Sequence, residues 1–319
     1  MNTKDIFKIA VDKAIEADLR GKSEVEKRMT RINKKFNELS EKQKVEFDKE
    51  KLNNPYVDSR ILNNPDETRE IKKVMTGIDI DSSELLLADK LGDVDLVISH
   101  HPQGAALAEL SAVMDLQAEV LAKYGLPINI AEAVTKFRAE EVNRGLSPIN
   151  HYRAVDTAKI LGLDFMCTHT TADNLAARFM HDLIQEKKPE YVEDIFAIFK
   201  EIPEYQESSA RQVGPKLFAG SKDSRVGKVV VTEFTGGTSG SKDVFEKMAH
   251  YGFGTIIGMH MSEEHRKEAE KHHMNVIIAG HMSSDSLGMN LFLDEIEKQG
   301  IEVIPTSGLI RVKRFNEKK

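Results

Sequence analysis

The stretch DVDLVISHHPQG, residues 93–104, holds the strongest indication of the fold and of a site in this chain. Its apolar run Leu96–Ile98 predicts a short buried strand, and two adjacent histidines, His100 and His101, follow almost directly. Either the two imidazoles lie at a loop edge by chance, or the strand delivers two ligands to one site. The choice depends on whether other strands of the chain end in the same way.

From about residue 74 onward, short apolar runs alternate with amphipathic helical segments. Candidate strands lie at 74–80, 95–101, 127–133, 164–170, 228–234, 254–260, 275–281 and 301–307. Candidate helices lie at 108–125, 148–162, 171–187, 241–252, 262–273 and 283–300. Continuous apolar strands that alternate with helices predict an α/β fold with a largely parallel sheet. The polar, turn-rich stretch 186–226 is expected to join two α/β halves.

The first 70 residues differ from the rest, because they are rich in Lys and Glu and almost free of glycine. Apolar residues recur there at a 4-3-4-3 spacing, at Val25, Met29, Ile32, Phe36 and Leu39. This stripe predicts a helix that packs on its own domain or on a neighbouring subunit, with an independent zipper as the alternative. We therefore expect a charged helical N-terminal extension over 1–70, a first α/β lobe over 71–190, and a linker with a second α/β lobe over 191–319.

Composition excludes several classes of protein. The formal net charge of −7 over 319 residues argues against general nucleic-acid binding, which needs a basic surface. Cys167 is the single cysteine, so a metal site would have to be built from His, Asp and Glu. The N-terminus has no signal-peptide core, and no apolar segment approaches membrane-spanning length. We expect no membrane partner and a cytoplasmic location.

Five of the eleven histidines share one kind of position, because each lies just beyond an apolar run. They are His100, His101, His169, His260 and His281. In open α/β sheets, ligands bind in the crevice outside the carboxyl ends of the strands. Four strand ends that carry histidine make chance a poor explanation, so these side chains are candidates for one site.

Two carboxylates accompany the histidines. Asp173 follows His169 by four residues and Asp285 follows His281 by four residues, each where a helix is expected to begin. Taken singly, an aspartate at a helix start is more often an N-cap. Together with the histidines, the two aspartates supply mixed nitrogen and oxygen ligands, which suit zinc, manganese, iron or cobalt better than calcium.

The number of candidate ligands indicates two metals. A single catalytic metal usually takes three protein ligands and a water, whereas this set has five. The five are His100, His101, Asp173, His281 and Asp285. Adjacent residues on a regular strand point to opposite faces, so His100 and His101 can converge only if the strand has ended and the chain bends.

Three motifs, DLVISHHP, HTTAD and IIAGHMSSD, together resemble the signatures of the Nif-three-like dinuclear-metal family. Some members of that family carry the name GTP cyclohydrolase I type 2 homologue. GIDID and KVVVTEFTGG also fit, and the resemblance covers roughly residues 74–310. It implies two related α/β lobes with mostly parallel sheets flanked by helices, and two divalent metal ions in the cleft between them, with zinc, iron or manganese expected. It also implies a homohexamer of stacked trimers.

The resemblance also assigns residues by position. His100 and His101 match the paired histidines, Asp173 the bridging carboxylate and His281 the late histidine. The last ligand of the family is usually Glu, whereas this chain has Asp285, which is one methylene shorter. Where the family often has a Gly-Glu pair, this chain has GMHMSEEH, so His260 is expected to line the site.

Paired metals lower the pKa of a shared water and polarise a phosphoryl or carbonyl oxygen. The sequence therefore favours a metal-dependent hydrolase, of cyclohydrolase or phosphoesterase type, acting on a nucleotide or another small phosphorylated compound. His169 is the catalytic candidate, because it could orient Asp173 or carry a proton, with a packed structural histidine as the alternative. A non-enzymatic metal-binding scaffold or regulator is the competing hypothesis. The loop TEFTGGTSGSKD, residues 232–243, is either an anion cradle or a plain strand–helix turn.

Overall fold

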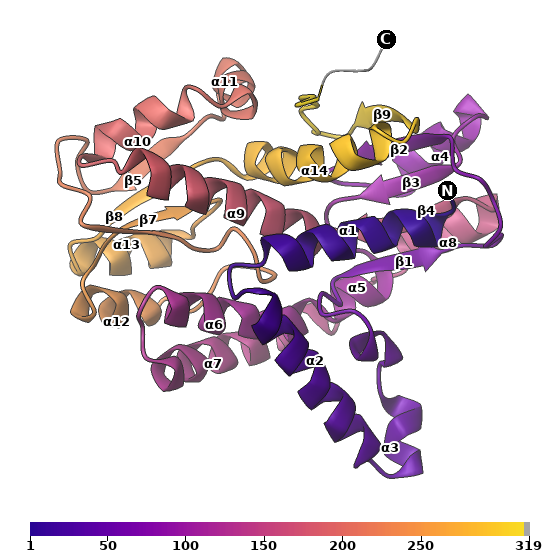
Figure 1. Cartoon of the computed structure of the whole chain (residues 1–319), viewed down its shortest axis with the longest axis horizontal. Helices are drawn as coiled ribbons and strands as arrows, with labels where there is room; N and C mark the ends of the chain where they lie inside the picture. The colour runs from indigo at the N-terminus through magenta and orange to yellow at the C-terminus, as the bar shows by residue number, and fades with distance from the viewer. Residues whose placement is uncertain (316–319) are drawn as a thin grey trace.

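The computed structural model describes residues 1–315, which build two sheets with helices on their faces (Figure 1). The first sheet has strand order β1-β4-β3-β2-β9, with bounds Ser59–Asn63, Asp164–Thr168, Leu96–Ser99, Lys73–Gly77 and Glu302–Thr306. The second sheet has strand order β5-β8-β7-β6, with bounds Lys216–Ala219, Asn275–Ile278, Phe253–Gly258 and Lys228–Val231. Within these two sheets, the pairings of the edge strands β1 and β5 are antiparallel and all the others are parallel. The predicted α/β class with mostly parallel sheets is confirmed.

Distant parts of the chain complete the first sheet. β1 comes from the N-terminal 70 residues and pairs with β4, while β9 comes from the end of the chain and pairs with β2. The strand predicted at 301–307 is therefore present as β9. It belongs to the first sheet, where it pairs with β2. The division of the chain at residues 70 and 190 stays a prediction.

Two long helices, α9 (His169–Lys187) and α14 (His281–Glu297), lie side by side and connect the two sheets (Figure 1). A Cβ atom added to Gly288 of α14 would lie 2.3 Å from the carbonyl oxygen of Ala172 of α9. Only glycine permits that approach, because no larger residue leaves room for the two backbones. The close contact fixes the relative position of the first turns of both helices.

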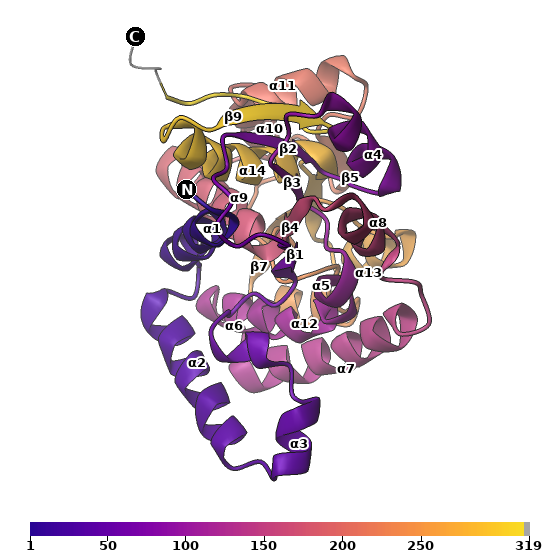
Figure 2. The same ribbon diagram turned by 90° about the vertical axis from the view of Figure 1, so that its right-hand side faces the viewer.

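The N-terminal segment forms α1 (Thr3–Ala17), α2 (Lys22–Asn37), α3 (Glu41–Glu46) and the short 3₁₀ helix η1 (Lys49–Leu52). α1 packs against α9, whereas α2 and α3 project from the body (Figures 1 and 2). The rings of Phe36 and Phe47 lie 5.0 Å apart, and Asn33 donates to the carbonyl of Leu52. The apolar stripe of α2 therefore packs in part against its own chain.

The other helices flank the sheets and connect their strands. They are α4 (Ser82–Leu91), α5 (Gly104–Ala108), η2 (Leu110–Val113), α6 (Asp115–Lys123), α7 (Ile128–Leu146), α8 (Arg153–Leu161), α10 (Val192–Phe199), α11 (Pro203–Ala210), α12 (Val244–His250) and α13 (Glu263–Lys271). None of the helices within residues 1–315 is both long and apolar enough to cross a membrane.

Two local expectations are wrong. The strand predicted at 127–133 is the start of α7, because Pro127 forms the N-cap and the buried Ala131 and Thr135 lie four residues apart on one helix face. The stretch 186–226 does lie between β4 of the first sheet and β6 of the second, as expected of a join, but it is not mainly turns, because it contains α10, α11 and β5.

Candidate metal centre

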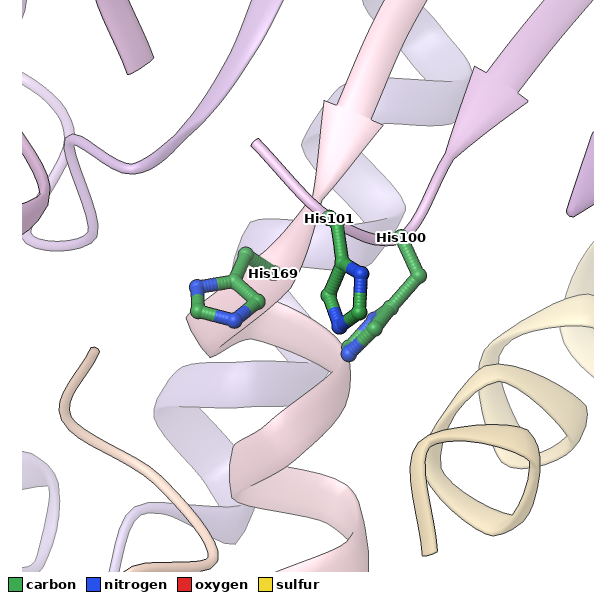
Figure 3. A group of neighbouring side chains, drawn as sticks. All are labelled: His100, His101 and His169. Atoms are coloured by element: carbon green, nitrogen blue, oxygen red, sulfur yellow. The ribbon is translucent and has the colours of Figure 1, made fainter. Parts of the chain in front are cut away.

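The paired histidines lie where β3 leaves its sheet. β3 ends at Ser99, whose hydroxyl donates to the carbonyl of His101 at 2.6 Å. The rings of His100 and His101 lie 5.2 Å apart, and His169, at the start of α9, joins them from the next strand end (Figure 3). The strand has ended before the two histidines, as their convergence requires.

The remaining candidates lie on the first turns of two helices. His169 and Asp173 are four residues apart on α9, and His281 and Asp285 are four residues apart on α14. That spacing places each pair on one helix face. The N-caps are Thr168 and Gly280, so neither aspartate is a cap. The capping alternative is therefore excluded for both.

Within residues 1–315, possible ligand atoms form three groups, one of which consists of His100, His101 and His169. The other two groups share one carboxylate. His100 Nε2 lies 3.4 Å from Asp173 Oδ1 and 3.5 Å from Asp285 Oδ1. On the other side, Asp285 Oδ2 lies 3.4 Å from His101 Nε2 and 3.6 Å from His281 Nε2. Asp285 thus presents one oxygen to each of these two groups, and these clusters could hold metal ions. The bridging position that the family resemblance gives to Asp173 is therefore taken by Asp285, because Asp173 faces only His100 among the proposed ligands.

Unpartnered polar atoms support that interpretation. Both ring nitrogens of His100, Oδ1 of Asp173 and both carboxylate oxygens of Asp285 are buried and lack a hydrogen-bond partner among the described residues. Buried polar atoms without partners are costly and rare in native proteins. Imidazole nitrogens and carboxylate oxygens converging on two points fit divalent transition metals, which would satisfy these atoms.

The charges within the cluster are strongly coupled. Burial disfavours the charged form of His100, but the carboxylates of Asp285 and Asp173 outweigh it and raise the pKa of His100 to about 10. His101 is affected in the same way, because burial is outweighed by Asp285 and Asp79, and its pKa rises to about 9. Burial of Asp285 is likewise outweighed by the two histidines, so its pKa falls well below the ordinary range. Protons and metal ions therefore compete for the same atoms.

Two carboxylates that the sequence analysis did not find contact the Nδ1 atoms of His101 and His169, on the side of each ring away from the site. Asp79 Oδ1 lies 2.7 Å from His101 Nδ1, and Asp58 Oδ2 lies 2.7 Å from His169 Nδ1. Each contact leaves the Nε2 atom of the histidine for the site, an arrangement typical of metal-ligating histidines. Asp79 lies inside the GIDID motif, which was a usable signal, whereas Asp58 precedes β1 and has no local signature.

The segments after β6 and β7 add two residues to the centre. A cavity of about 10 Å³, close to the room for one water molecule, lies beside the candidate ligands. His169, Asp173 and His281 line it together with Glu233 and His260. The position of His260 agrees with the expectation that it lines the site.

Glu233 is the third residue that sequence reasoning missed. It sits in the TEFTGG loop with a positive φ of 57°, which is uncommon for a residue other than glycine. Its Oε1 accepts a hydrogen bond from the Gly240 N–H at 3.1 Å. Burial raises the pKa of Glu233 to about 7, so the carboxyl can exchange a proton near neutral pH.

Comparisons with solved structures agree with the fold. No family model and no curated protein matches the sequence. Among solved structures, a NIF3 superfamily protein from Sphaerobacter thermophilus matches with a TM-score of 0.78 and 25% identity, over 97% of this chain and 99% of that chain. Reduced HcgD from Methanocaldococcus jannaschii matches in fold alone, with a TM-score of 0.50 and 16% identity, over 77% of this chain and 87% of that chain. The resemblance of this chain to the Nif-three-like family, predicted from three short motifs, is therefore confirmed across its fold.

Proposed function

We propose that this chain is a dinuclear metal-binding protein that hydrolyses a nucleotide or another small phosphorylated substrate. The observation that carries the proposal is the Asp285 carboxylate, whose two oxygens face two separate groups of ligand atoms. His100 and Asp173 would complete one metal position, and His101 and His281 the other. Ions held there would supply a Lewis acid and lower the pKa of a water between them.

The side chains around the ligands have roles of their own. Asp58 holds the ring of His169, whose Nε2 lies 3.8 Å from Asp173 Oδ2. His169 would therefore orient Asp173 or hold a proton beside it. Glu233, which lines the same cavity, would give a proton to the leaving group or take one from the water. His260 is held by Ser239, at 2.8 Å, and also lines this cavity.

A metal-binding scaffold or regulator is the second candidate function. The feature that favours it is the pair α2 and α3, which projects from the body and offers surface for another protein (Figures 1 and 2). A scaffold would hold the same metals but would show no metal-dependent turnover.

Elemental analysis combined with a substrate panel tests the proposal. Protein purified without chelator should carry about two metal ions per chain. It should also release product from at least one nucleotide or phosphoester. His101→Ala should lose turnover and metal while keeping its circular dichroism spectrum. Metal without turnover on any substrate would favour the scaffold, and absence of metal after reconstitution would overturn both functions.

A further inference from the structure

A second cavity, of about 750 Å³, lies between α10, α11 and the edge strand β5. These elements are grouped at one end of the molecule in Figure 1. None of the residues that line this cavity lines the cavity at the metal centre. Its volume falls within the range of small-molecule sites, roughly 300–1,000 Å³. The cavity is therefore large enough to be a binding site in its own right.

One wall of the cavity is aromatic. The rings of Phe199 and Tyr205 are buried and lie 5.2 Å apart, and Phe196 meets Phe199 at 6.3 Å. The hydroxyl of Tyr205 is paired with that of Ser284 on α14, at 3.0 Å, so it needs no partner from a ligand. Phe196 and Leu217 are only partly buried and offer the apolar surface, and the buried rings of Phe199 and Tyr205 pack behind it.

The remaining wall carries positive charge. Lys200, Lys216 and Lys222 line the cavity, and no carboxylate lines it with them. Among the described residues none of the three forms an ion pair, and Lys222 Nζ lies 5.1 Å from the ring centroid of Phe196. A lysine bent over an aromatic ring keeps its stem on apolar surface and its ammonium group at the rim.

Three acidic residues in or beside α11 are engaged elsewhere. Glu201 pairs with Lys187 at 3.0 Å, and Glu207 pairs with Arg211 at 2.9 Å. Glu204 is buried and pairs with Arg314. The lining of the cavity therefore carries positive charge in a chain whose net charge is −7.

We propose that this cavity binds a small amphipathic anion, with an apolar body on the aromatic wall and one carboxylate between the lysines. The three ammonium groups would hold the carboxylate through charge-assisted hydrogen bonds. The apolar body has the size of a medium acyl chain or a fused aromatic ring. A ligand of either kind would combine an apolar body with one carboxylate. The site does not depend on the function proposed for the metal centre.

Titration calorimetry of the full-length, metal-loaded protein with decanoate, 2-naphthoate and neutral decanol tests the proposal. At least one of the two anions should bind with one molecule per chain, and the better of them identifies an acyl or an aromatic ligand. Decanol should bind at least about tenfold more weakly, because it lacks the charge. Equal binding of decanol, or no binding of either anion, would overturn the proposal.

Charge variants locate the site. Lys222→Glu should weaken anion binding by at least about tenfold. Lys90→Glu is the matched control, because Lys90 is exposed on α4 and forms no ion pair among the described residues, so it should bind as the parent does. His101→Ala should also keep anion binding, which separates this site from the metal centre. Unchanged anion binding in Lys222→Glu would overturn the assignment. The assignment would also be overturned if the protein bound no anion and self-associated through this surface, with Lys222→Glu dissociating the assembly.

Discussion

Asp285 is the residue on which both proposed metal positions depend, because each of its oxygens faces a different group of ligands. Asp285→Asn replaces one oxygen by a donor and removes the charge, so both ions should be lost. Asp173 faces only one other proposed ligand, His100, so Asp173→Asn should lose about one ion of two. Metal per chain measured by elemental analysis checks the difference. Equal losses in the two variants would contradict the shared role of Asp285.

Protonation of His100 and His101 gives metal binding a defined pH dependence. Their pKa values of about 10 and about 9 in the metal-free protein mean that both rings are protonated at neutral pH. Each ion must displace a proton, so metal affinity should rise with pH up to about pH 9, by about tenfold per unit for each proton released. Metal titrations at pH 6.5 and 7.5 in a non-chelating buffer measure this slope. A flat affinity would mean that the rings are already neutral.

The carboxyl of Glu233 lets proton transfer be separated from metal binding. Glu233→Gln keeps the size and the hydrogen bond from Gly240 but cannot titrate. We expect the variant to retain its metal and to lose 10²–10⁴-fold in hydrolysis, roughly the effect of a general acid or base. The parent's pH–rate profile should change slope near pH 7, and that limb should be missing in Glu233→Gln. A purely structural Glu233 would leave the shape of the profile unchanged.

At the scale of elements, the sequence could place the ligands because each lies directly beside a regular pattern. The end of the apolar run of β3 indicates that His100 and His101 lie at the edge of a sheet. The four-residue spacing at a helix start indicates that the histidine and the aspartate lie on the same helix face. Asp58 could not be found in this way, because it lies 111 residues from His169 and contacts it only after β1 has paired with β4. The helices α10 and α11 were missed because each spans only eight residues, about two turns, which is too short for a clear helical period.

The contact between α9 and α14 makes Gly288 a test of how the helices position the site. In Gly288→Ala the new methyl group would lie 2.3 Å from the Ala172 carbonyl oxygen, so the helices must separate. We expect a loss of about 1–3 kcal/mol in unfolding free energy, the usual effect of overpacking, together with weaker metal binding. Gly145→Ala on α7 is the control, since nothing lies within 4 Å of its added Cβ. Urea unfolding of the metal-free proteins measures the unfolding free energy of both variants. Equal stability of the two variants would contradict the close helix contact.

At the scale of the whole molecule, the candidate metal centre lies at the junction between two sheets. α9 leaves the first sheet after β4 and α14 leaves the second sheet after β8, and their first turns meet beside the end of β3. Residues as far apart in sequence as His100 and Asp285 converge because both sheets direct their carboxyl ends to this place. The α/β class was predictable from alternation, but the contribution of β1 and β9 to one sheet was not, since edge pairing depends on tertiary contacts.

The outer surface of the first lobe bears on assembly. Leu86 and Leu91 of α4 are 54% and 49% exposed, and Ile160 of α8 is 85% exposed, on two helices that pack together. Large exposed apolar side chains on neighbouring helices are a common sign of a subunit interface. We therefore expect the homohexamer implied by the family resemblance, and light scattering of the purified protein measures its mass. Ile160→Lys should reduce the assembly without removing metal, because α8 contributes no ligand. A monomeric parent protein would contradict the prediction, and a hexamer unaffected by Ile160→Lys would place the interface on another face.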